Sequence, residues 1–127
     1  MLNPGKFVLV IDDERIVCRA FEKELGDQGY KVDSANDGNA AIELVKKKEY
    51  DLIFIDFVLP GKDGIQVCKE IKAINKNAKM IFMTGNIDID PIFKEMEFID
   101  AGGRTYQLYK PFIEGELLEI AQKALQE

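Results

Sequence analysis

The chain has 127 residues, 46% of them hydrophobic and 31% charged, which suits one ordinary globular domain, and we expect a single domain over residues 1–127. A formal net charge of −6 argues against binding nucleic acid by neutralising phosphates, and the lack of histidine excludes Ser-His, Cys-His and His-metal chemistry within the chain. No apolar run approaches the roughly 20 residues that a membrane helix needs, and no secretory signal is recognisable, so we expect a cytoplasmic protein without membrane binding.

The first half of the chain alternates short apolar runs with amphipathic segments. Residues 7–11 predict a buried strand, and residues 31–35 predict a weaker one. Residues 15–25 carry apolar side chains at helical spacing, and residues 39–47 do the same after the turn-like Asn36-Asp37-Gly38. This alternation is typical of βα units.

The second half continues with three apolar runs and three helical segments. The runs predict strands at residues 52–57, 79–83 and 106–109. Helices are predicted at residues 64–74, after Asp90 as N-cap with Pro91 at the first position, and through Leu117, Leu118, Ala121 and Leu125. Nearly continuous apolar strands are expected where helices cover both faces of a parallel sheet. We therefore predict an α/β fold with a doubly wound, five-stranded parallel sheet and five helices.

Polar side chains interrupt the apolar runs where the predicted strands end. They are Asp12, Asp13, Asp56, Thr84 and Lys110. Because the carboxyl ends of parallel strands share one edge of an open sheet, these residues should converge on a single crevice. A helix cap or a surface charge would explain each aspartate alone. The five-residue set at matching strand ends instead favours one functional site.

The residue types at this site suggest phosphoryl transfer. Three carboxylates brought together repel one another unless a cation lies between them, and Mg²⁺ suits a site with few protein oxygens plus water and phosphate ligands. Asp56 is already ionised near neutral pH and can attack phosphorus once the phosphoryl charge is neutralised. Lys110 adds a positive charge for that purpose, and Thr84 adds a hydroxyl donor.

Four motifs carry a family resemblance from about Phe7 to the last helix. They are Ile11-Asp12-Asp13-Glu14, Asp56-Phe57-Val58-Leu59-Pro60-Gly61 with Gly64, Thr84-Gly85, and Lys110-Pro111-Phe112. In this order and at this spacing they resemble the motifs of two-component response-regulator receiver domains of the chemotaxis-regulator type. The resemblance implies the strand order 2-1-3-4-5, which is one of the common doubly wound orders.

The resemblance also implies roles for the aspartates and their neighbour. Asp56 would be the phosphorylated residue, and Asp13 a direct ligand of Mg²⁺. Asp12 would contact metal-bound water more closely than the metal itself, and Val58 would offer its backbone carbonyl to the metal. The expected metal site therefore consists of Asp12, Asp13, Asp56 and Val58.

Further roles follow for the residues after the fourth and fifth strands. Thr84 would move toward the phosphoryl group once Asp56 carries it, and Lys110 would bridge Asp56 and a phosphate oxygen. Gly85 would keep the entrance open, and Pro111 would follow a cis peptide bond. Since the chain has no histidine, the donor would be a partner histidine kinase or phosphotransfer protein. The target of the output signal would be a downstream effector protein or an effector domain missing from this chain.

Two departures from the family pattern concern the output. Gln107 stands where the family usually has an aromatic residue that reorients on activation, and strand parity places Tyr106 on the other face. Thr84 and Lys110 are also a few positions further apart than is common, which indicates an insertion near the fourth helix. We therefore expect the fourth-helix region to carry the readout, with partner binding dependent on Phe98. The alternative is that Phe98 only packs under the inserted segment.

Two other functions fit parts of the pattern. A Mg²⁺-dependent phosphohydrolase could form the same aspartyl phosphate and release phosphate with many turnovers. Enzymes of the haloacid-dehalogenase type usually place their two carboxylates two residues apart after the first strand, and Asp12-Asp13 has a different spacing. A flavodoxin-like FMN binder is a third possibility, which the acidic crevice disfavours.

Overall fold

The computed structural model describes residues 5–85, 99 and 107–126. Five strands form one sheet in the order β2-β1-β3-β4-β5, and every pairing is parallel. The strands are β1 (Phe7–Ile11), β2 (Lys31–Ala35), β3 (Leu52–Asp56), β4 (Met80–Thr84) and β5 (Gln107–Tyr109). The predicted sheet and strand order are confirmed, although β3 ends one residue early and β4 is shifted by one residue.

Four helices accompany the sheet in the part of the chain that the structure describes. They are α1 (Arg15–Gly26), α2 (Gly38–Lys47), α3 (Gly64–Ile74) and α5 (Glu116–Leu125). Five helices were predicted, and that number is not matched. The helix expected after Asp90, together with Phe98 and Tyr106, lies outside the described residues. None of the described helices has the length and apolar character needed to cross a bilayer.

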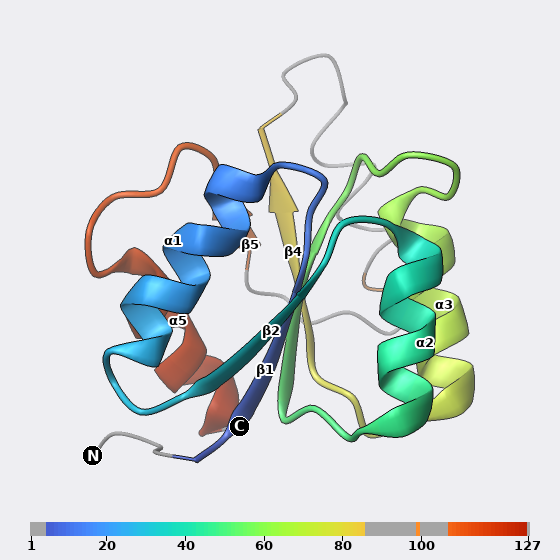
Figure 1. The fold of residues 1–127 in the computed structure, drawn as a ribbon, viewed down its shortest axis with the longest axis horizontal. Helices are drawn as coiled ribbons and strands as arrows, with labels where there is room; N and C mark the ends of the chain where they lie inside the picture. The colour runs from blue at the N-terminus through green and yellow to red at the C-terminus, as the bar shows by residue number, and fades with distance from the viewer. Residues whose placement is uncertain (1–4, 86–98, 100–106, 127) are drawn as a thin grey trace.

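Two apolar layers cover the sheet because successive side chains of each strand point to opposite faces. Val8 and Val10 pack on the side of α1 and α5, whereas Leu9 and Ile11 pack on the side of α2 and α3. Figure 1 shows the two helix pairs on either side of the sheet. All five residues of β3 are buried, as expected for the central strand of a sheet that is covered on both faces.

The helices begin in different ways. Asp37 accepts a hydrogen bond from Ala40 N at the start of α2, and Asp63 does the same from Gln66 N at the start of α3, both at 2.8 Å. Glu14 occupies the N-cap of α1, but its side chain makes no capping hydrogen bond. α1 and α2 thus begin soon after the carboxyl ends of β1 and β2, whereas residues 57–63 form a loop between β3 and α3.

Candidate functional site

The carboxyl edge of the sheet brings the predicted site residues to one place. Asp12 directly follows β1, Asp56 is the last residue of β3, and Thr84 is the last residue of β4. Lys110 follows β5, and its N–H donates to the carbonyl of Thr84 at 2.9 Å. The parallel register keeps the strand ends nearly level, since Ile11 pairs with Ile55 and the next residue, Asp56, pairs with Met83.

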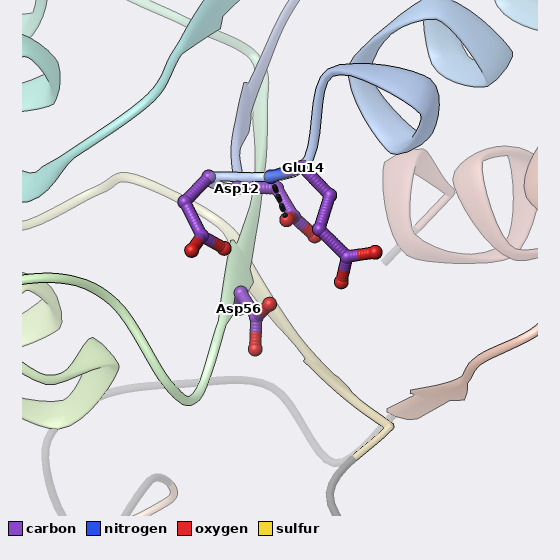
Figure 2. Close-up of side chains that lie close together, drawn as sticks. Asp12, Glu14 and Asp56 are labelled. Carbon is purple, nitrogen blue, oxygen red and sulfur yellow. Dashed lines mark hydrogen bonds between the residues drawn. The ribbon is translucent and has the colours of Figure 1, made fainter.

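Four carboxylates gather at this edge. Each of Asp12, Asp13, Glu14 and Asp56 offers one oxygen atom that lies within 4.8 Å of the others. Figure 2 shows that the side chains of Asp12, Glu14 and Asp56 lie close together beyond the ends of β1 and β3. Asp12 and Asp56 are buried, whereas Asp13 and Glu14 are exposed. The cluster thus has a buried base and an open, acidic rim.

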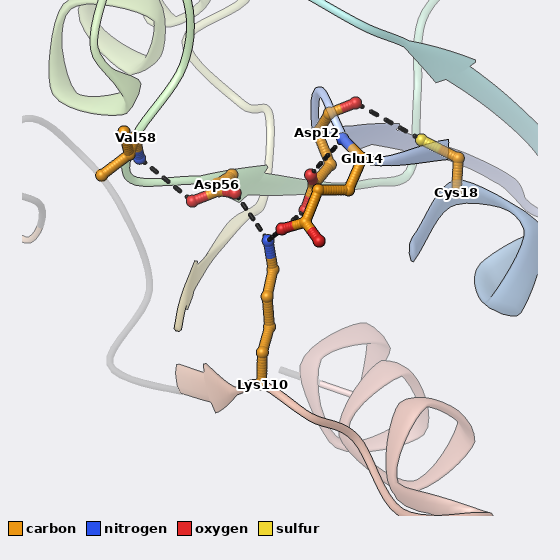
Figure 3. A network of polar contacts seen from close by, with 6 residues as sticks. All are labelled: Asp12, Glu14, Cys18, Asp56, Val58 and Lys110. Carbon is orange, nitrogen blue, oxygen red and sulfur yellow. Dashed lines mark hydrogen bonds and ion pairs between the residues drawn. The ribbon is translucent and has the colours of Figure 1, made fainter. Parts of the chain in front are cut away.

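Lys110 is the cation that the described residues place among these carboxylates. Its Nζ atom lies 2.6 Å from Asp56 Oδ2, 2.7 Å from Asp12 Oδ2 and 3.1 Å from Glu14 Oε1. The contacts with Asp56 and Glu14 have hydrogen-bond geometry, and the contact with Asp12 is an ion pair. Figure 3 shows the lysine side chain extending from the end of β5 to a position between these groups.

The pKa values reflect this crowding. Burial raises the pKa of Asp12 to about 6, although the contact with Lys110 and the hydrogen bond from Glu14 N pull it down. Burial alone would lower the pKa of Lys110, but the contacts with Asp12 and Asp56 outweigh that effect and raise it. The ammonium group is therefore charged at neutral pH, while Asp12 carries its charge at a cost that a further cation would relieve.

Backbone groups orient the two buried carboxylates. Glu14 N donates to Asp12 Oδ1 at 2.8 Å, and Val58 N donates to Asp56 Oδ1 at 3.0 Å. Gly64 packs so closely against the backbone at the end of β3 that a Cβ atom there would clash with the Asp56 carbonyl oxygen. The glycine in this motif is therefore required for the close approach of α3 to the Asp56 loop.

The remaining predicted residues border the same site. Thr84 is buried, and a Cβ atom on the neighbouring Gly85 would lie 3.1 Å from Lys110 Cβ, so a larger residue there would press on the lysine. The Lys110–Pro111 peptide bond is cis, as the resemblance implied. Val58 is 46% exposed beside Asp56. All six residues named for the site lie at the same edge of the sheet.

A cleft of about 1000 Å³ opens at this edge. Asp13, Glu14, Asp56 and Lys110 line its polar part, and its wall includes side chains of α1 and of the segment after β5. The cleft therefore gives Asp56 a path to solvent and to a partner.

The carboxylate set fits a hard divalent cation. Oxygen ligands from aspartates suit Mg²⁺, which keeps several waters and needs few protein groups. Asp12 Oδ2 is buried and forms an ion pair with Lys110 at 2.7 Å, but it accepts no hydrogen bond from the described residues, so it keeps a lone pair for a metal-bound water. The chemistry of the donors and this buried oxygen both fit the predicted ion.

Glu14 is the site residue that sequence reasoning missed. It belongs to the Ile11-Asp12-Asp13-Glu14 motif, yet no role was predicted for it. Its carboxylate contacts Lys110. The available signal was its position before the first helix, where Ser, Thr, Asp or Asn would be better caps than Glu.

The fold and the site together define a doubly wound α/β module with an acidic cleft at the carboxyl edge of its parallel sheet. A family model described as "Response regulator receiver domain" matches residues 8–122. The chain therefore belongs to the response regulator receiver domains, the signal-receiving modules of two-component systems.

Individual relatives agree with this assignment. The chain is 32% identical to "Response regulator MprA" of Mycobacterium leprae over 111 residues, which cover 87% of this chain and 47% of MprA. It thus spans about half the length of the curated relatives that it matches.

Two solved structures show the same likeness. The chemotaxis protein CheY4 of Vibrio cholerae has a TM-score of 0.85 and 28% identity over 94% of this chain and 98% of that one. The response regulator TrrA of Thermotoga maritima, solved in complex with Mg²⁺ and BeF, has a TM-score of 0.76 and 30% identity over the same shares. Both matches cover nearly the whole of each chain.

Proposed function

We propose that this receiver domain accepts a phosphoryl group on Asp56 from a histidine of a partner kinase or phosphotransfer protein. The observation that carries the proposal is the position of the Asp56 carboxylate, which lines an open cleft and lies 2.6 Å from the Lys110 ammonium. A carboxylate in this setting is a nucleophile with a fixed positive charge beside it.

The transfer itself is a direct displacement at phosphorus. A carboxylate oxygen of Asp56 forms a bond to phosphorus, the bond between phosphorus and the donor imidazole nitrogen breaks, and its electron pair stays on that nitrogen. The product is an acyl phosphate on Asp56. No general base is needed, because the carboxylate carries no proton to remove. The donor histidine lies outside residues 1–127, since these contain none.

Mg²⁺ is the proposed cofactor, held by Asp13, Asp56 and the Val58 carbonyl, with Asp12 acting through metal-bound water. When bound, the ion would neutralise phosphoryl oxygens and draw the donor and acceptor together. The hydrogen bond from Glu14 N to Asp12 Oδ1 and the ion pair of Oδ2 with Lys110 support this division of roles, because they hold the Asp12 carboxylate at the buried base of the site while Asp13 lies exposed at its rim.

Lys110 and Thr84 are proposed to stabilise the product. Lys110 is already in contact with Asp56 and can give one of its N–H groups to a phosphoryl oxygen. Thr84 ends the neighbouring strand and is joined to Lys110 through the backbone hydrogen bond between them. A movement of Thr84 toward the phosphoryl group would therefore also shift the backbone at the end of β5.

The proposed output is a change in protein contacts. The target is a downstream effector protein or an effector domain outside this chain, since the relatives are about twice as long. Residues 1–127 are proposed to act as one receiver module that catalyses its own phosphorylation and dephosphorylation. Neither nucleic acid nor a membrane is a proposed partner of this module, and its cytoplasmic location stays a prediction.

Incubation with acetyl phosphate tests the proposal. We expect uptake of one phosphoryl group per chain, dependent on Mg²⁺ and measured as a mass increase of the intact protein. Sustained release of inorganic phosphate over many turnovers would instead support the phosphohydrolase. No comparison supports that second activity.

A further inference from the structure

Glu14 stands out because its side chain does not cap the helix that begins after it. It is the N-cap of α1, yet it makes no capping hydrogen bond, whereas Asp37 and Asp63 cap α2 and α3 with their carboxylates. The first turn of α1 is therefore left without a side-chain acceptor from its cap residue. The Glu14 carboxylate reaches the Lys110 ammonium at 3.1 Å instead. A local rule broken in this way indicates a function elsewhere.

The three carboxylates around Lys110 hold it unequally. Asp56 and Asp12 lie 2.6 and 2.7 Å from Nζ, and their side chains are 8% and 0% exposed. Glu14 is the most distant of the three, and its side chain is 55% exposed. Separating a buried carboxylate from its cation costs several kcal/mol, whereas an exposed ion pair contributes only about 0–1 kcal/mol because water replaces the lost partner. The contact with Glu14 is therefore the easiest of the three to give up.

A phosphoryl group on Asp56 would need N–H donors and positive charge that Lys110 now directs at these carboxylates. An ammonium group has only three N–H donors, and three carboxylates already surround this one. Asp56 and Glu14 each accept one of its hydrogen bonds, and the ion pair with Asp12 lies on a third side. A phosphoryl oxygen that approaches this ammonium competes with these contacts, and the exposed contact is the one whose loss costs least.

We propose that Glu14 competes with the phosphoryl group for the Lys110 ammonium and thereby limits how readily Asp56 is phosphorylated. This inference rests on the proposed function of Asp56 as the phosphoryl acceptor. Glu14 acts here through Lys110, so it is a positioning residue. Its backbone is suited to the task, because the bond from Glu14 N to Asp12 Oδ1 fixes the start of its side chain beside the site.

Binding of beryllofluoride, a mimic of the phosphoryl group, tests the competition without turnover. At saturating Mg²⁺ we expect Glu14→Gln to bind beryllofluoride about two- to fivefold more tightly than wild type, the range that an exposed ion pair permits. Glu14→Asp keeps the charge but is one methylene shorter and loses the contact, so it should behave like Glu14→Gln. The matched control is Glu22→Gln, which removes the same charge from an exposed position of α1.

A second readout needs neither Mg²⁺ nor beryllofluoride. In the metal-free protein, the ¹⁵Nζ resonance of Lys110 should shift in Glu14→Gln and Glu14→Asp and stay unchanged in Glu22→Gln. Unchanged or weaker beryllofluoride binding by Glu14→Gln would overturn the inference, as would an Asp variant that matches wild type, which would indicate plain charge repulsion. If wild type itself bound no beryllofluoride, the proposed function would fall as well. The two failures are thus distinguishable.

Discussion

Two aspartates of this chain lie in opposite electrostatic surroundings. Asp12, at the carboxyl edge of the sheet, has a pKa raised to about 6 by burial. Asp33, on the edge strand β2, has a lowered pKa: burial would raise it, but hydrogen bonds from the Tyr50 hydroxyl at 2.7 Å and from Lys48 Nζ at 3.0 Å outweigh that effect. The fold satisfies the charge of Asp33 and leaves the charge of Asp12 only partly compensated.

The difference separates carboxylates that stabilise the fold from carboxylates that serve the site. A satisfied carboxylate such as Asp33 has its partners within the protein. The cluster of Asp12, Asp13, Glu14 and Asp56 has one cation, Lys110, among the described residues, so an incoming cation or a transferred group changes its energy strongly. Substitutions in the two regions should therefore have different consequences.

The largest expected effect is the loss of phosphorylation in Asp56→Asn. The amide is nearly isosteric with the carboxylate but is a poor nucleophile, so Mg²⁺-dependent labelling by acetyl phosphate should disappear while the circular dichroism spectrum stays unchanged. Asp33→Asn is the matched control and should be labelled like wild type, since Asp33 lies outside the cleft. Labelling that persisted in Asp56→Asn, on any residue, would contradict the assignment.

The next effect concerns the affinity for Mg²⁺. If Asp13 contacts the ion directly and Asp12 acts through water, Asp13→Ala should weaken binding more than Asp12→Ala, and the latter should cost about 10- to 100-fold, as is usual for outer partners of a metal. Titration with Mg²⁺, followed by NMR shifts of the site residues, measures both affinities. Equal losses would show that the two aspartates share the same role.

The sequence predicted the sheet and most of the site for a simple physical reason. Short apolar runs that alternate with amphipathic segments impose βα units, and parallel topology then brings every strand end to one edge. Asp12, Asp56 and Lys110 could be placed together without knowledge of any side-chain conformation. The end of β3 was missed by one residue because the apolar run continues to Phe57, and β4 was missed by one residue because its last pair involves the polar Thr84.

Contacts made by long side chains across the fold could not be predicted in this way. Glu14 reaches Lys110 across 96 positions of sequence, and Glu24 reaches the start of α5 across 91. Neither contact follows from the spacing of residue types. The readout expected at Phe98 and the fate of the aromatic switch near Gln107 stay predictions, since the side chains concerned lie outside the described part of the chain.

The pH dependence of stability should have opposite signs for Asp12 and Asp33. The folded-state pKa of Asp12 lies above its ordinary value of 3.8, so its stabilising contribution is present below about pH 4 and lost as pH rises through about 6. The folded-state pKa of Asp33 is lowered, so its contribution is present above about pH 4 and lost as pH falls further.

Urea unfolding of the metal-free protein measures this contrast. Between pH 4 and pH 7, Asp12→Asn should gain stability relative to wild type by at most about 3 kcal/mol, the equivalent of a two-unit shift. Asp33→Asn should instead lose about 1 kcal/mol at pH 7, because a charged acceptor of two hydrogen bonds is removed. A gain that survived saturation with Mg²⁺ would contradict the explanation, since the ion should favour the ionised form of wild-type Asp12.

The smallest effect comes from Glu24, a third carboxylate, which caps a helix that is not its own. The N-cap of α5 is Gly115, which has no side chain, and Glu24 of α1 instead accepts hydrogen bonds from Gly115 N at 3.2 Å and Leu118 N at 2.8 Å. Loss of a capping acceptor usually costs about 1 kcal/mol, so Glu24→Ala should lower the free energy of unfolding by about that amount. Glu22→Ala, on the exposed side of the same helix, should change it by less than about 0.5 kcal/mol.

Both variants should be phosphorylated at the wild-type rate, because Glu24 belongs with Asp33 among the carboxylates satisfied by the fold. Slower phosphorylation of Glu24→Ala alone would show instead that the packing of α5 against α1 affects the position of Lys110, which lies six residues before α5 begins.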